Sequence, residues 1–109
     1  MTPNDRRLLV LKLKSNKVGE RRSAVKAMWR SGDANFAPFI LERLQGEALD
    51  DASVWQSKCL MIAALGDLEF RAALPALRAL AERDFRSSSI IYSEIAFAIC
   101  RLTPSVPGR

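Results

Sequence analysis

The hydrophobic positions of this chain recur at helical spacing, and the densest run marks its centre. From Leu60 to Leu65 every residue is apolar, and most of these residues favour helices. A helix that is hydrophobic on all sides must be covered by neighbours on more than one side. The pattern therefore predicts a central helix that begins near Trp55 and lies in the middle of the core.

Turn residues mark the end of this helix and the start of the next. Gly66 follows the apolar run, as expected of a residue with positive φ at a helix C-terminus, and Asp67 can bond the turn backbone. Pro75 fits only in the first turn of a helix, so the next helix is expected to start near Ala72 or Ala73. Its predicted buried stripe contains Phe70, Leu74, Leu77 and Ala81.

The same pattern occurs earlier in the chain. Residues 23–33 align with residues 57–67 at an offset of 34, so that Gly32-Asp33 falls on Gly66-Asp67. Pro38 then corresponds to Pro75. A partial third copy supplies a last helix over 88–102, whose expected buried residues are Ile91, Ile95 and Leu102. A period of this size with two helices per unit indicates stacked helical hairpins.

Two short motifs carry a family resemblance. Ala64-Leu65-Gly66-Asp67, followed by Ala73-Leu74-Pro75-Ala76-Leu77, resembles the HEAT-like repeat, which is also seen in phycobilin-lyase-type repeat proteins. In that family the first motif ends one helix and the second opens its partner. The second repeat has three more residues between Gly-Asp and Pro than the first, so we expect a different turn there. The resemblance implies an α-solenoid that binds protein or nucleic acid, and it implies no single activity.

Three further helices complete the predicted layout. The first, over 4–15, opens with Thr2 as N-cap, and its buried side is expected to hold Leu8, Leu9, Leu11 and Leu13. The second, over 19–31, is expected to bury Val25, Met28 and Trp29 and to expose Arg21, Arg22, Lys26 and Arg30. The third, over 36–46, has Pro38 in its first turn and the buried stripe Phe36, Ile40 and Leu44.

The expected fold class is all-α, a short right-handed HEAT-like α-solenoid of about five to six antiparallel helices. At 109 residues the chain is expected to form one domain over 1–103, followed by a flexible tail over 104–109. Ile90, Tyr92 and Phe97 do not all fit one buried stripe. Either the tail folds back over them or they form a contact patch.

Composition weighs against a catalytic or metal site. The chain has no histidine, which excludes Ser-His and Cys-His nucleophile systems and histidine metal ligands. Cys59 and Cys100 are expected to be reduced core residues, and Lys58 is expected to point outward. We therefore expect neither an enzyme nor a cofactor. With no signal peptide and no apolar run long enough to span a bilayer, a cytoplasmic protein without a membrane partner is expected.

The charges are unevenly distributed along the chain. Residues 1–30 hold nine Lys and Arg against two acids, whereas residues 31–70 hold two basic residues against seven acids. The basic end suggests attraction to phosphate backbones or simply a solvated terminal face. Its candidate nucleic-acid contacts are Arg6, Arg7, Lys12, Lys14, Lys17, Arg21, Arg22 and Lys26. Core packing is favoured over base stacking for Trp29 and Trp55.

The acidic middle suggests a different function. Its candidate partner contacts are Glu42, Glu47, Asp50 and Asp51, which the predicted layout places on or just after the helix over 36–46. Such a surface suits a basic protein partner, although Asp50 and Asp51 could instead cap the central helix. The leading hypothesis is a non-catalytic protein-binding module, such as an inhibitor or immunity-type protein that masks a nuclease toxin. The alternative is a nucleic-acid backbone binder.

Overall fold

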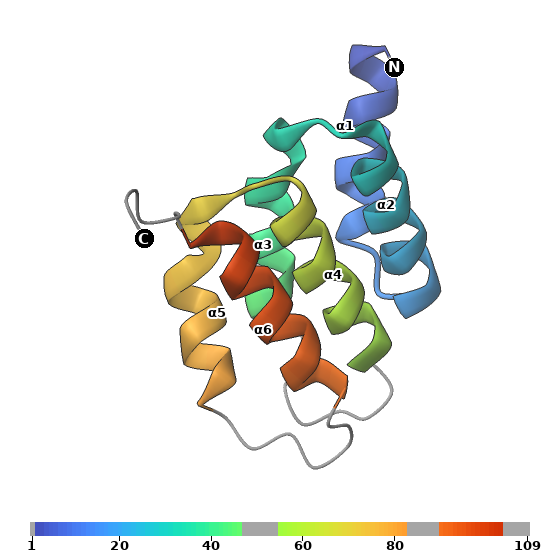
Figure 1. Cartoon of the computed structure of the whole chain (residues 1–109). Coiled ribbons are helices and arrows are strands. Elements are labelled where there is room, and N and C mark those ends of the chain that lie inside the picture. Colours follow the sequence, from blue (N-terminus) through green and yellow to red (C-terminus); the bar gives the residue numbers. More distant parts are fainter. Residues whose placement is uncertain (1, 47–54, 83–89, 104–109) are drawn as a thin grey trace.

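A computed structural model describes residues 2–46, 55–82 and 90–103 of the chain, and these residues contain helices and no strands. Six α-helices and two short 3₁₀ turns follow one another (Figure 1). They are α1 (Pro3–Leu13), α2 (Val18–Ser31), η1 (Ala34–Phe36), α3 (Ala37–Gly46), α4 (Trp55–Asp67), η3 (Arg71–Ala73), α5 (Leu74–Ala81) and α6 (Ile90–Leu102). The predicted all-α class is confirmed for the described residues.

Helices α2, α4 and α6 lie side by side in one layer (Figure 1), and α4 packs against both of the others. Helix α1 packs against α2 and α3, and α3 packs against α4. Helix α5 packs against α6. The smallest dimension of the molecule is 17 Å, which matches two helices packed about 8–10 Å apart. Helix α4 is therefore in contact with helices on three sides.

The core is centred on α4, as the apolar run predicts. Met61, Ile62, Ala64 and Leu65 are fully buried, while Leu60 and Ala63 are half-buried. The helices that pack on α4 contribute further buried side chains around them. These are Val25, Met28, Ile40, Leu44, Ile91 and Ile95. These residues form one continuous cluster with Leu102. Burial of apolar surface between α4 and the three helices around it is the main favourable contribution to this fold.

The prediction for Gly66 is wrong. Helix α4 continues to Asp67, and the positive φ falls on Glu69, at 57°. The Phe70 N–H bonds the Leu65 carbonyl at 3.1 Å, and the Glu69 N–H bonds the Gly66 carbonyl at 3.1 Å. These two bonds close the helix in the Schellman manner, with Glu69 in the position usually held by glycine.

Gly66 instead allows a close approach between helices. A Cβ at this position would lie 3.3 Å from the Ala98 Cα of α6. The glycine that aligns with it at the offset of 34, Gly32, has a φ of 67° and open space around it, and it ends α2 as predicted. Glycine thus allows close helix packing at position 66 and forms a turn at position 32.

Helix α1 begins as predicted but buries fewer residues. The Thr2 hydroxyl accepts the Asp5 N–H at 3.1 Å, and the Asp5 carboxylate accepts the Thr2 N–H, which completes a capping box. Of the four leucines expected inside, Leu13 is buried and Leu9 is half-buried, whereas Leu8 and Leu11 are each 59% exposed. The reason is that α1 is the first helix and has neighbours on one side, and the helical period turns Leu8 and Leu11 away from them.

Helix α5 also differs from the prediction in its buried stripe. Pro75 lies in its first turn, as expected, and a 3₁₀ turn over Arg71–Ala73, which was not predicted, precedes it. The buried residues are Ala73, Leu77 and Leu80, whereas Phe70 and Leu74 are half-buried and Ala81 is exposed. Because Phe70 precedes the 3₁₀ turn, it does not share the helical register of α5. The expected stripes of α3 and α6 are confirmed at Phe36, Ile40, Leu44, Ile91, Ile95 and Leu102.

Two expectations concern residues that the structure does not describe. The tail at 104–109 and the linker at 47–54 lie outside the described residues, so the question of a folded-back tail stays open. Tyr92 is half-buried, and Phe97 is 70% exposed on α6. Within the described ranges, no helix is both long and apolar enough to cross a bilayer.

Replacing Leu65 with Ala tests the central position of α4. The side chain is fully buried, so the cavity left behind is expected to lower the free energy of unfolding by ~2–5 kcal/mol. Leu8→Ala is the matched control, because the same chemical change at a 59% exposed position is expected to cost under ~0.5 kcal/mol. Urea denaturation followed by circular dichroism measures both values. Equal effects of the two substitutions would contradict the assignment of the core.

Candidate interaction surfaces

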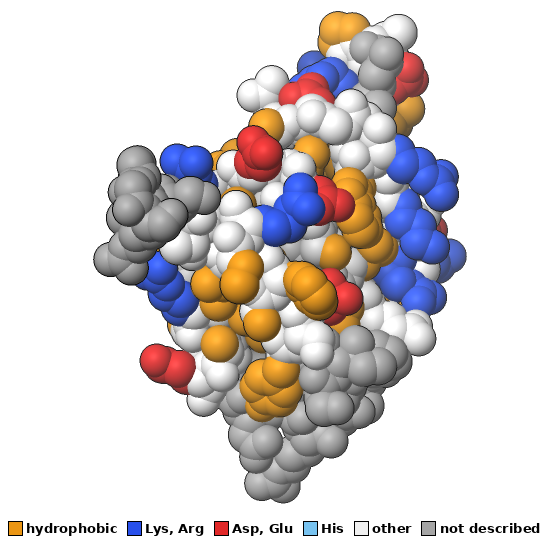
Figure 2. All heavy atoms as spheres, in the orientation of Figure 1, with side chains coloured by type: hydrophobic (Ala, Val, Ile, Leu, Met, Phe, Trp, Pro, Cys, Tyr) orange, Lys and Arg blue, Asp and Glu red, His pale blue; other side chains and the backbone are white. Residues whose placement is uncertain are grey.

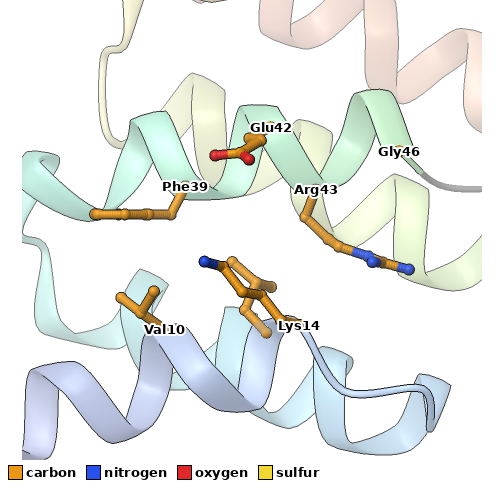
Figure 3. Close-up of a pocket in the computed structure, with 7 residues that line it drawn as sticks. Val10, Lys14, Phe39, Glu42, Arg43 and Gly46 are labelled. Carbon is orange, nitrogen blue, oxygen red and sulfur yellow. The ribbon is translucent and has the colours of Figure 1, made fainter.

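A groove lies between α1 and α3, and Figure 3 shows the residues that line it. Its volume is about 380 Å³, and it is lined by Val10, Leu13, Lys14, Phe39, Glu42, Arg43 and Gly46. Val10 and Lys14 reach into the groove from α1 and face Phe39 on α3. Phe39 is 39% exposed, so part of its ring is accessible in the groove. The groove therefore has an apolar floor with charged side chains of both signs around it.

One of the four predicted acidic contacts lies in this groove. Glu42 is exposed on α3 and lines the groove beside Phe39. Glu47, Asp50 and Asp51 lie outside the described residues. An acidic surface that extends from α3 into the following linker therefore stays a prediction at three of its four positions.

The structure separates the eight predicted basic contacts into two groups. Arg21 was expected on the solvent face of α2, but it is 5% exposed and its Nη1 donates to the Ser15 carbonyl at 2.8 Å. Its position one turn before Ala24 and Val25 directs its side chain toward the α1–α2 connection rather than toward solvent. Arg6 forms an ion pair with Asp33, and its guanidinium carbon lies 4.8 Å from the centre of the Phe36 ring. These two side chains hold the first two helices and the following turn together.

The other six basic residues remain accessible to a ligand. Arg7, Lys12, Lys14, Lys17 and Lys26 are exposed, and half-buried Arg22 donates to the Gln56 side chain at 2.8 Å. Arg22, Lys26 and Arg30 are spaced by four residues and therefore lie along one side of α2. We call these three residues the α2 basic ridge. Figure 2 shows a column of Lys and Arg side chains over this helix.

Two aspartates that align at the sequence offset of 34 connect neighbouring helices. Asp33 accepts the Asn35 N–H at 2.9 Å, and this bond, together with Arg6, lowers the pKa of its carboxyl group. Asp67 accepts the Trp29 indole N–H at 2.8 Å and lies 3.3 Å from the Arg101 Nε. Asp67 thus connects α2, α4 and α6. The polar edge of Trp29 has a structural role, and the ring is half-buried rather than fully inside as predicted.

The chemically reactive side chains of the described residues show no convergent arrangement. Cys59 is half-buried, Cys100 is exposed, and both are free thiols, so the expectation of a buried Cys100 is wrong. Burial, reinforced by the negative charge of Glu94, raises the pKa of the Cys59 thiol to about 11, which keeps it protonated at neutral pH. Lys58 was expected to point outward, but its side chain is 1% exposed. The helical period places it on a side of α4 that faces the interior. Within residues 2–46, 55–82 and 90–103, no three Cys, Asp or Glu side chains lie close enough to hold a metal ion.

A second hollowed surface lies on the outer side of α2, α4 and α6. Trp29, Leu60, Ala63 and Phe97 are its accessible apolar residues, and we call this surface the α4 face. Figure 2 shows apolar side chains gathered over α4 and α6, beside the column of basic side chains on α2. Sequence reasoning did not assign this face, although the failure of Phe97 to fit a buried stripe was the signal for it.

Comparison of the chain with protein-family models, with curated proteins and with solved structures gave no match.

Proposed function

We propose that this chain is a non-catalytic module that binds another protein through the groove between α1 and α3. The observation that carries the proposal is Phe39, a partly exposed ring on an apolar floor within a rim of charged residues. Protein interfaces commonly have an apolar centre surrounded by a polar rim, and a few aromatic anchors supply most of their binding energy. Lys14 and Glu42 would then fix the orientation of the partner at the rim.

The finer part of the proposal is a right-handed, HEAT-like stack of helical hairpins. Its support is the repeated order of a helix, a 3₁₀ turn and a second helix, in α2–η1–α3 and again in α4–η3–α5. The equivalent aspartates Asp33 and Asp67 each pair with an arginine from a neighbouring helix, which also favours a duplicated unit. The narrower hypothesis is an inhibitor or immunity-type role against a basic partner. Of its four predicted acidic contacts, Glu42 is the one that lies among the described residues.

Replacing Phe39 with Glu tests this proposal. A charge at the centre of the groove is expected to reduce capture of the partner from native lysate by at least about tenfold, because desolvating an unpaired carboxylate is costly. Leu8→Glu is the matched control, since it introduces the same charge at an exposed apolar side chain of α1 outside the groove. Captured proteins are quantified by mass spectrometry, and circular dichroism checks that both variants stay helical. Unchanged capture by the Phe39 variant would contradict the proposal.

Binding to a nucleic-acid backbone is the second candidate function. The observation that favours it is the α2 basic ridge, together with the exposed Arg7, Lys12, Lys14 and Lys17 elsewhere on α1 and the α1–α2 connection. Rows of cations on a helix are suited to following phosphates. Arg6 and Arg21 lend this candidate no support, because their guanidinium groups bond Asp33 and the Ser15 carbonyl.

A salt titration tests the second candidate. If the accessible basic residues neutralise phosphates, the logarithm of the affinity for duplex DNA is expected to fall with the logarithm of salt concentration, with a slope of ~0.9 per phosphate contact. Fluorescence anisotropy of a labelled duplex provides the measurement. The charge reversal Lys26→Glu is expected to lower the slope by about one. Absence of binding at low salt would rule out this function.

A further inference from the structure

The α4 face contains two hollows that lie on either side of one helix. The first, between α2 and α4, has a volume of about 420 Å³ and is lined by Lys26, Trp29, Arg30 and Leu60. The second, between α4 and α6, has a volume of about 170 Å³ and is lined by residues that include Ala63, Gly66 and Phe97. Leu60 and Ala63 are three residues apart and lie on the same side of α4, so both hollows open onto the same surface.

The dimensions of this surface match a single α-helix. Packed helices lie about 8–10 Å apart, so α2 and α6 lie about 16–20 Å apart on either side of α4. An α-helix with its side chains is about 10–12 Å wide and can therefore rest over α4 between its two neighbours. Its apolar side chains would enter the two hollows. Phe97, at 70% exposure, would supply the largest newly buried surface.

The charges around the hollows distinguish between possible occupants. The α2 edge carries the basic ridge of Arg22, Lys26 and Arg30. The charged residues lining the hollow beside α6 are Asp67, Glu94 and Arg101, and Arg101 pairs with Asp67. Because Arg101 offsets one of the two carboxylates, this hollow keeps a net negative charge that disfavours a nucleic-acid backbone crossing the face. The half-buried Leu60 and Trp29 offer such a backbone no polar contact. A peptide helix with acidic residues along one side matches the ridge and still fills the apolar hollows.

We propose that the α4 face binds one amphipathic helix of a partner protein, whose apolar stripe fills the two hollows and whose acidic side lies against the α2 basic ridge. This site is separate from the groove between α1 and α3 and does not depend on it. Helix α4 has 13 residues and is about 20 Å long, so a partner helix of roughly four turns covers the face.

A synthetic peptide helix provides the test. The probe is a covalently constrained helix of roughly 16 residues, with leucines at helical spacing, glutamates along one side and glutamines elsewhere. One comparison peptide carries lysines in place of the glutamates, and another carries serines in place of the leucines. Each is titrated into the isotope-labelled full chain, and amide chemical shifts locate the site. The shift changes are expected on the outer sides of α2, α4 and α6.

Protein variants separate the two parts of the proposal. The double reversal Lys26→Glu and Arg30→Glu is expected to raise the dissociation constant of the acidic peptide at least about tenfold and to allow the lysine peptide to bind. Arg7→Glu with Lys12→Glu is the matched control, with the same charge change on α1 and no expected effect on affinity. Phe97→Ser is expected to weaken binding of the acidic peptide, and the serine peptide is not expected to bind.

Several outcomes would overturn the proposal. Equal binding of the serine peptide would mean that charge alone attracts the probe. Shift changes confined to the groove between α1 and α3 would place the peptide elsewhere. Self-association of the chain that Phe97→Ser abolishes would mean that a second copy occupies the face. A short DNA duplex that shifts the same amides, while the acidic peptide does not, would assign the face to nucleic acid.

Discussion

The fold depends on keeping water away from one helix. The apolar side chains of α4 point in almost every direction, so α4 is stable only where α2, α3 and α6 cover it. Gly66 permits α6 to approach closely, because any larger side chain at this position would meet the Ala98 backbone. At the end of the same helix, Asp67 bonds Trp29 and Arg101 and so connects the two helices that flank α4. Apolar packing and polar contacts thus both hold α2 and α6 against α4.

The sequence predicts this arrangement well where local chemistry decides it. The helices, the Thr2 cap, the Gly32 turn and the buried stripe of α3 follow from helical period, capping and turn preferences. The predictions are wrong where a residue depends on which helix lies beside it. Gly66 is a packing residue because α6 crosses there, and Leu8 is exposed because nothing among the described residues covers the outer side of α1.

The candidate sites were harder to predict for the same reason. Counting charges along the chain places Arg21 with Arg22 and Lys26, although the helical period turns Arg21 inward and leaves the other two on the surface. The hollows beside α4 require three helices that lie far apart in sequence, and no periodicity within one segment reveals them. The one local signal was that Ile90, Tyr92 and Phe97 do not all fit one buried stripe, which left a contact patch as one of two possibilities.

Native-state hydrogen exchange tests the central position of α4 most directly. Amides that exchange only on global unfolding lie in the elements with the most buried contacts, whereas edge elements open separately. Because α4 is covered on three sides and α1 on one, the amides of Met61, Ile62 and Leu65 are expected to exchange most slowly, and those of α1 to exchange faster. If the α1 amides are as protected as those of α4, or more so, the stability of the fold does not depend on burial of α4.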